Sequence, residues 1–119
     1  MDLRQFQQIN SDRGKRWHQG NLLQWTLLEW CGAMCGEAGE AANYAKKIRR
    51  LDLQLPNKEA GLNKSNYDEL RIKLGNEIAD TIIYGLLTLS ALDLDAEQMI
   101  RNVFDKKSEE YGFPERTPR

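Results

Sequence analysis

Apolar residues along this chain recur every three or four positions over long stretches, without the alternation that is typical of strands. The longest stretch runs from Leu22 to Ile48 and predicts one long helix. Its periodic apolar or small residues are Leu23, Leu27, Trp30, Met34, Ala38, Ala41 and Ala45. The basic run at residues 46–50 suits the end of a helix, because cations interact favourably with the negative end of the helix dipole.

A second long helix is predicted from Tyr67 to Leu92. Its apolar stripe consists of Leu70, Leu74, Ile78, Ile82 and Leu86, and is widened by Ile83 and Leu87. The intervening residues 51–65 have no clear periodicity and contain Pro56 and Gly61, which are turn formers. They predict a connection that is long for two helices and therefore a candidate functional loop.

Shorter helices are predicted at both ends of the chain. Asp95 followed by Gln98 resembles a capping box, which opens a helix from Ala96 to about Tyr111. Gly112 and the proline that follows it then end this helix. At the other end, a helix is predicted from Leu3 to Arg13.

The segment from Gly14 to Asn21 reads as a loop that holds Trp17 and His18. Four helices of these lengths predict an all-α fold of the four-helix-bundle type. The chain has 119 residues and no internal repeat, so residues 1–119 are expected to form a single domain.

Composition narrows the classes of partner. Lys and Arg number 17 and Asp and Glu 18, for a net charge of −1, so the chain lacks the basic surface of a nucleic-acid polymer binder. No apolar run approaches the roughly 18–20 residues that span a bilayer, so no membrane contact is expected. Cys31 and Cys35 lie one helical turn apart, a poor disulfide site, and are expected to be small buried thiols in a reduced, cytoplasmic compartment.

The predicted helices carry apolar residues on more than one side, although the core of so small a bundle is thin. Trp25, Trp30 and Met34 are therefore expected to bury against a second subunit. Obligate association is the prediction, and a monomer with a few exposed apolar residues is the alternative.

Two acidic pairs carry the candidate chemistry. Glu37 and Glu40 lie in the first long helix, and Glu77 and Asp80 lie in the second. Residues three apart share a helix face, where like charges repel, and both pairs border apolar stripes. Four such carboxylates require a compensating cation, and oxygen ligands select Mg²⁺, Mn²⁺ or Ca²⁺. A solvated acidic surface is the alternative.

The sequence gives less support to a di-iron site. A di-iron bundle needs Glu-x-x-His from two helices, and His18 is the sole histidine. Gly36 and Gly39 flank the first acidic pair at a cost in helix propensity, which suggests that another helix or a ligand approaches there.

Three segments together resemble the MazG-type all-α nucleoside triphosphate pyrophosphohydrolases. They are Trp25–Arg50 with G-E-A-G-E at its centre, E-I-A-D-T-I-I-Y at Glu77–Tyr84, and K-K-S-E-E-Y-G-F-P at Lys106–Pro114. The resemblance implies Mg²⁺-dependent cleavage of a (d)NTP to the monophosphate and pyrophosphate, with Mn²⁺ as a possible substitute. It implies a role in house-cleaning or nucleotide-pool control, and a homodimer or a homotetramer built as a dimer of dimers.

The same resemblance assigns Glu37, Glu40, Glu77 and Asp80 as metal-binding and catalytic residues. Tyr84 is then a candidate contact to the sugar or base, with a core tyrosine as the alternative. Lys47 lies two turns after Glu40 and is a candidate phosphate ligand, with a solvated helix-end cation as the alternative. The remaining substrate-binding candidates are Trp17, His18, Asn21, Trp25 and Lys106. The rings of Trp17, His18 and Trp25 could stack on a base.

The chain departs from the family pattern at two places. The gap between Glu40 and Glu77 is long, and the K-F-N that often precedes the C-terminal run is absent, which leaves Lys106 or Lys107 to bind phosphate. Alternative substrates are dUTP, phosphoribosyl-ATP or a guanosine alarmone. The alternative from another class is a metal-binding helical interaction module without catalysis.

Overall fold

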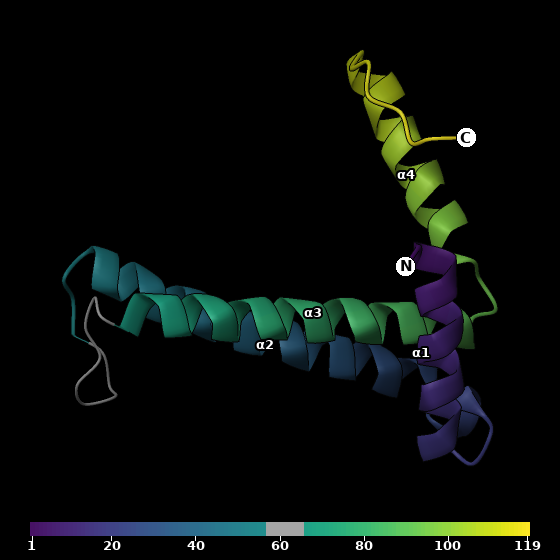
Figure 1. Ribbon diagram of the computed structural model, residues 1–119, viewed down its shortest axis with the longest axis horizontal. Helices are drawn as coiled ribbons and strands as arrows, with labels where there is room; N and C mark the ends of the chain where they lie inside the picture. Colours follow the sequence, from purple (N-terminus) through teal and green to yellow (C-terminus); the bar gives the residue numbers. More distant parts are fainter. Residues whose placement is uncertain (57–65) are drawn as a thin grey trace. The chain divides into compact units, whose positions relative to one another are not determined.

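The computed structural model describes residues 1–56 and 66–119, which form four α-helices and contain no strand. The elements are α1 (Leu3–Trp17), the 3-10 turn η1 (Leu22–Gln24), α2 (Leu27–Asp52), α3 (Tyr67–Ala91) and α4 (Ala96–Tyr111) (Figure 1). The all-α prediction is therefore confirmed. Most of the predicted connection, residues 57–65, lies outside the described residues. None of the described helices combines the length and apolarity needed to cross a bilayer.

Helix α1 continues beyond the predicted end at Arg13 and reaches Trp17, so Trp17 lies on a helix rather than in a loop. The predicted loop began at Gly14, but this glycine lies inside the helix, where its backbone packs closely against other side chains. A Cβ at this position would meet a methyl of Leu87 at 2.8 Å and a methyl of Leu22 at 3.1 Å. Gly14 lets the helix pack against these two side chains.

Helix α2 begins at Leu27, five residues later than predicted, because a separate turn precedes it. The Asn21 side chain accepts a hydrogen bond from the backbone N–H of Leu23 at 2.9 Å and so caps η1. Trp25 then adopts an extended backbone, with φ −89° and ψ 148°. The periodic leucines at 23 and 27 therefore belong to different elements.

The ends of α4 follow the sequence signals with one difference. Asp95 is the N-cap, but its side chain accepts from the N–H of Glu97 at 3.0 Å, and the Gln98 amide donates to Asn102 instead. Asp95 is therefore the N-cap as predicted, but neither hydrogen bond of the predicted capping box is present. Gly112 ends the helix in the left-handed conformation, with φ 71°, as predicted.

The described residues fall into two compact units. The first comprises Met1–Leu27 and Leu86–Arg119, and the second comprises Leu28–Gly85. In the first unit, Gln7 on α1 joins the turn between α3 and α4. Its Nε2 donates to Ser90 Oγ at 3.2 Å and to the Leu94 carbonyl at 2.9 Å, while its Oε1 accepts from Ala96 N–H at 2.8 Å.

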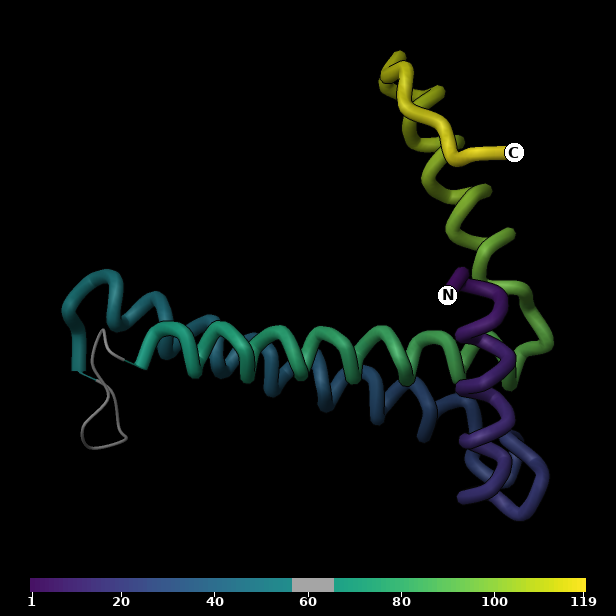
Figure 2. The backbone as a smooth tube through the Cα atoms, viewed as in Figure 1, coloured from purple at the N-terminus to yellow at the C-terminus, as the bar shows by residue number. Residues whose placement is uncertain are grey.

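The second unit is a hairpin in which α2 and α3 run side by side in opposite directions (Figure 2). In α2 the buried or half-buried face passes through Trp30, Met34, Glu37, Ala41, Tyr44, Ile48 and Leu51. In α3 the corresponding face within this unit passes through Leu70, Leu74, Glu77, Thr81 and Tyr84. Both rows alternate steps of three and four residues, which is the spacing of a coiled coil. We define these two rows as the seam.

The seam corrects the predicted stripes. In α2 it passes through Glu37 and Tyr44, whereas the expected Ala38 and Ala45 are exposed. In α3 it leaves Ile78 and Ile82 about half exposed, at 48% and 55%. The prediction chose the most apolar residues for the buried face. The seven-residue repeat of a coiled coil instead places one carboxylate in each row.

Trp30 is already buried within its own chain, so no second subunit is needed to bury it. It is 1% exposed within the chain, and its ring lies 6.3 Å from that of Tyr84 between centroids. Met34 likewise packs within its own hairpin. Its sulfur lies 3.3 Å from the position that a Cβ would take if Gly85 carried one. Cys31 is half-buried but Cys35 is exposed, so the prediction of two buried thiols is wrong for Cys35.

Candidate metal centre

The carboxylates of the candidate site come from the middle of the seam. Glu37 and Glu77 both occupy seam positions, so the antiparallel pairing of α2 and α3 brings them face to face. The pairing is fixed one heptad away by Trp30 and Tyr84, whose rings pack together. Asp80 follows Glu77 by almost one helical turn and therefore projects from the same side of α3.

These three side chains converge on one place. Glu37, Glu77 and Asp80 each offer a carboxylate oxygen, and the three oxygens all lie within 4.8 Å of one another. Glu37 and Glu77 are half-buried, whereas Asp80 is exposed. Three negative charges at this separation repel strongly unless a proton or a cation intervenes.

The closeness of these carboxyl groups changes the pKa of Glu77. The pKa of Glu77 is raised from 4.5 to about 6, first because its protonated form hydrogen-bonds the Glu37 side chain. Partial burial and then the charges of Glu37, Asp80 and Glu40 raise it further. A proton shared between Glu37 and Glu77 thus takes the role that a cation can fill when the carboxylates are ionised.

Glu40 lies outside the group of three but within its electric field. It is exposed on α2, and its charge is the smallest of the influences that raise the pKa of Glu77. The structure therefore gathers all four predicted carboxylates in one region, with Glu37, Glu77 and Asp80 as the closest set.

The donor chemistry of this group suits a hard divalent cation. All three ligand groups are carboxylates, and no histidine or cysteine takes part. Oxygen donors of this kind bind Mg²⁺, Mn²⁺ or Ca²⁺ in preference to softer ions. Thr81 also lies in the seam, next to the group, and was not predicted as a site residue. Its hydroxyl donates to the Glu77 carbonyl oxygen at 2.8 Å, so this proton is not donated to one of the carboxylates.

Lys47 and Tyr84 lie in the same hairpin as the carboxylates. Tyr84 occupies the seam against Trp30 and is half-buried, as expected for a core tyrosine. The Lys47 ammonium lies over the Tyr44 ring, 5.1 Å from its centroid, and is also half-buried. A cation over an aromatic face is held by the ring's negative π surface.

The other substrate-binding candidates lie in the first unit. His18 is only 8% exposed, and its ring meets that of Trp25 edge to face at 4.9 Å. The expectation that His18 stacks on a base stays a prediction. Trp17 is 71% exposed beneath the Arg13 guanidinium, Asn21 is committed to capping η1, and Lys106 is exposed on α4.

Comparison of the chain with protein-family models, curated proteins and solved structures gives no match. The resemblance to MazG-type enzymes therefore stays a prediction from sequence motifs.

Proposed function

We propose that this protein is a Mg²⁺-dependent nucleoside triphosphate pyrophosphohydrolase, which cleaves a (d)NTP to the monophosphate and pyrophosphate. The observation that carries the proposal is the convergence of Glu37, Glu77 and Asp80 from two antiparallel helices. The position of Glu37 and Glu77 in a packed seam is costly for folding, because like charges replace apolar side chains there. A bound cation offsets that cost and gives the arrangement a reason to exist.

In this proposal Glu37, Glu77 and Asp80 hold Mg²⁺, with Glu40 at their side. Mg²⁺ supplies charge neutralisation for the triphosphate oxygens and for the charge that develops in the transition state. The carboxylates project from two helices whose rings at Trp30 and Tyr84 pack together. This packing holds the carboxylates at fixed positions before substrate binds.

The reaction requires one proton acceptor from the chain. Water attacks the α-phosphorus, the bond to the β-phosphate oxygen breaks, and pyrophosphate leaves with the bonding electron pair. Glu40 accepts the proton of the attacking water in our assignment, because it borders the group of three without belonging to it. Lys47 is the nearest predicted phosphate ligand along α2, seven residues beyond Glu40 on nearly the same face.

Assembly into a homodimer or homotetramer belongs to the same proposal. The hairpin leaves several large apolar side chains at least half exposed or nearly so, which favours burial against another copy. They are Leu28, Leu53, Leu55, Ile72, Ile78 and Ile82.

The test is a product assay. The purified protein is incubated with each common NTP and dNTP plus Mg²⁺, and the nucleotide products are separated while pyrophosphate is measured. We expect monophosphate and pyrophosphate from the native protein and from Glu110→Gln, which removes an exposed α4 carboxylate. We expect loss of turnover in Glu40→Gln and in Asp80→Asn.

The other outcomes separate the alternatives. Diphosphate and phosphate as products would contradict attack at the α-phosphorus. Turnover confined to dUTP, phosphoribosyl-ATP or a guanosine alarmone would keep the chemistry and change the substrate. Near-normal activity in Glu40→Gln would remove its assignment as proton acceptor. A Mg²⁺-dependent rise in melting temperature without turnover of any of these would identify a non-catalytic metal-binding module.

A further inference from the structure

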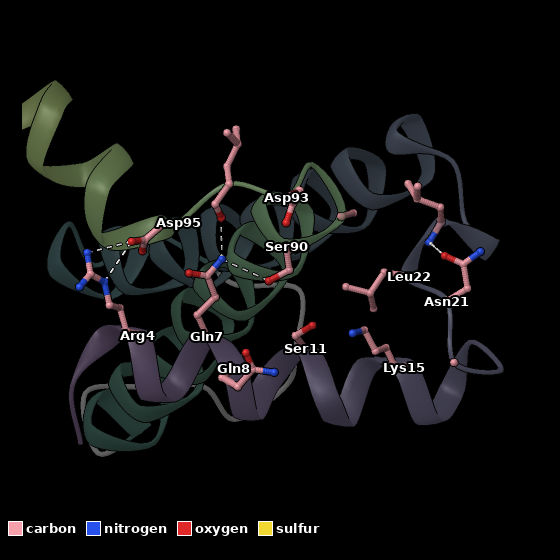
Figure 3. Close-up of a pocket in the computed structure, with 14 residues that line it drawn as sticks. Arg4, Gln7, Gln8, Ser11, Lys15, Asn21, Leu22, Ser90, Asp93 and Asp95 are labelled. Carbon is pink, nitrogen blue, oxygen red and sulfur yellow. Dashed lines mark hydrogen bonds and ion pairs between the residues drawn. The ribbon is translucent and has the colours of Figure 1, made fainter.

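The first unit contains a cavity of about 710 Å³ that the proposed reaction does not use. One face of α1 forms one wall, the turn from α3 into α4 forms another, and the approach to η1 closes one end (Figure 3). Its volume lies within the range of about 300–1,000 Å³ that is usual for small-molecule sites. Its charged lining side chains are Arg4, Lys15, Asp93 and Asp95.

Two of these four charges are already neutralised. Arg4 pairs with Asp95 at 2.9 Å and with Glu97 at 2.7 Å, and so closes one end of the cavity. Lys15 and Asp93 differ from this pair. Over residues 1–56 and 66–119, neither side chain makes an ion pair or a hydrogen bond, even with the other. The cavity therefore presents one uncompensated cation and one uncompensated anion.

Two hydroxyls add donors to the same cavity. Ser11 is 8% exposed, and its hydroxyl forms no hydrogen bond with another described side chain or backbone group. The Ser11 oxygen keeps some access to solvent, so its hydroxyl can donate to a ligand in the cavity. Ser90 Oγ accepts from Gln7 Nε2 and keeps its own proton for another acceptor. Figure 3 shows the Ser11 hydroxyl and the Lys15 ammonium pointing toward each other above α1.

The backbone at Asp93 gives an independent reason to attribute a function to its carboxylate. Asp93 N–H donates to the Ser90 carbonyl at 3.0 Å and Leu94 N–H donates to the Leu89 carbonyl at 2.9 Å. These two bonds form a Schellman motif, whose left-handed residue is usually glycine. Asp93 takes that place with φ 56°. The chain therefore keeps a carboxylate where glycine would be easier, and no described residue uses that carboxylate.

We propose that this cavity binds a small zwitterion, a molecule that carries one anionic and one ammonium group. Lys15 and the Ser11 hydroxyl bind the anionic group, since they are the free cation and free donor on the α1 wall. Asp93 binds the ammonium group from the opposite wall. Ser90 lies on the Asp93 side and donates to a polar atom of the ligand between the two charges (Figure 3).

The test uses the full-length, ¹⁵N-labelled protein and a series of ω-amino acids of increasing length. Glycine, 4-aminobutyrate and 6-aminohexanoate are titrated while amide chemical shifts are recorded, with butyrate and butylamine as single-charge comparators. We expect saturable shifts at Ser11, Lys15, Ser90 and Asp93. One chain length should bind best, and about tenfold or more tightly than either comparator, because each charge contributes a charge-assisted bond.

Variants separate binding from folding. Lys15→Gln and Asp93→Asn should each weaken the best zwitterion by about tenfold or more, whereas Lys106→Gln, an exposed cation on α4, should not. Asp93→Gly should abolish binding while the melting temperature stays the same or rises, because glycine suits the left-handed backbone. Equal affinity for butyrate or butylamine, or absence of saturable shifts for the whole series at millimolar concentration, would overturn the proposal.

Discussion

Lowering the pH from 7 to 5 should weaken the binding of Mg²⁺ or Mn²⁺ at the hairpin carboxylates by about tenfold. The cause is Glu77, whose pKa is raised to about 6 by its hydrogen bond with Glu37 and by the neighbouring charges. With this pKa, roughly nine-tenths of Glu77 is ionised at pH 7 and about one-tenth at pH 5. A cation competes with that proton, so its apparent affinity follows the ionised fraction.

The stability of the metal-free protein should show the opposite dependence on pH. The folded-state pKa of Glu77 lies above its ordinary value of 4.5, so the folded chain holds this proton more tightly than the unfolded chain. The stabilisation from protonation is therefore complete below about pH 4.5 and is lost as the pH rises through about 6. A divalent cation should restore stability on the alkaline side of that window.

Thermal unfolding at pH 5, 6 and 7, with and without millimolar Mn²⁺, measures both effects. Calorimetric titration in two buffers of different ionisation enthalpy adds the number of protons released per cation, which should rise as the pH falls from 7 to 5 because more of Glu77 is then protonated before the cation binds. Glu77→Gln should remove the pH dependence of stability between pH 5 and 7, and Glu110→Gln should leave it unchanged. Equal cation affinity at pH 5 and 7 in the native protein would refute the reasoning, as would proton release that survives Glu77→Gln.

Three further predictions concern packing. Trp30→Ala should cost about 3–5 kcal/mol in urea denaturation, because Trp30 is fully buried, whereas Trp30→Phe should cost less; equal costs would contradict its packing role. Gly14→Ala should destabilise by up to about 2 kcal/mol, since overpacking against Leu87 exceeds the gain in helix propensity. Gly36→Ala should instead stabilise by about 1 kcal/mol, because a Cβ there meets no atom within 4 Å among residues 1–56 and 66–119; a loss would show that another molecule occupies that space.

Sequence periodicity predicted the helices well and their faces less well. The two long helices and α4 follow from apolar spacing and end signals that are local in sequence. The start of α2 was misplaced because leucines 23 and 27 keep helical spacing across an extended residue, Trp25. The end of α1 was misplaced because Gly14 serves a long-range contact with Leu87, which no local signal reveals.

The four carboxylates were predictable because like charges three residues apart on two helices break the usual surface pattern. Their pairing across the hairpin was not predictable from each helix alone. It depends on which residues of α2 face which residues of α3, and apolar character pointed to Ala38 and Ile78 rather than to Glu37 and Glu77. The cavity around Lys15 and Asp93 was missed for a similar reason, since its walls come from opposite ends of the chain.

The coiled-coil spacing of the hairpin leaves more than one way to align its two helices. Sliding α3 by one heptad along α2 would keep the helix faces in contact but would set Glu37 opposite Leu70 or Tyr84, away from Glu77. Repulsion between the carboxylates favours such a slip, whereas the contact between the Trp30 and Tyr84 rings opposes it. The aromatic pair thus selects the alignment in which the acidic residues meet, and loss of the indole would disperse the site before it unfolded the helices.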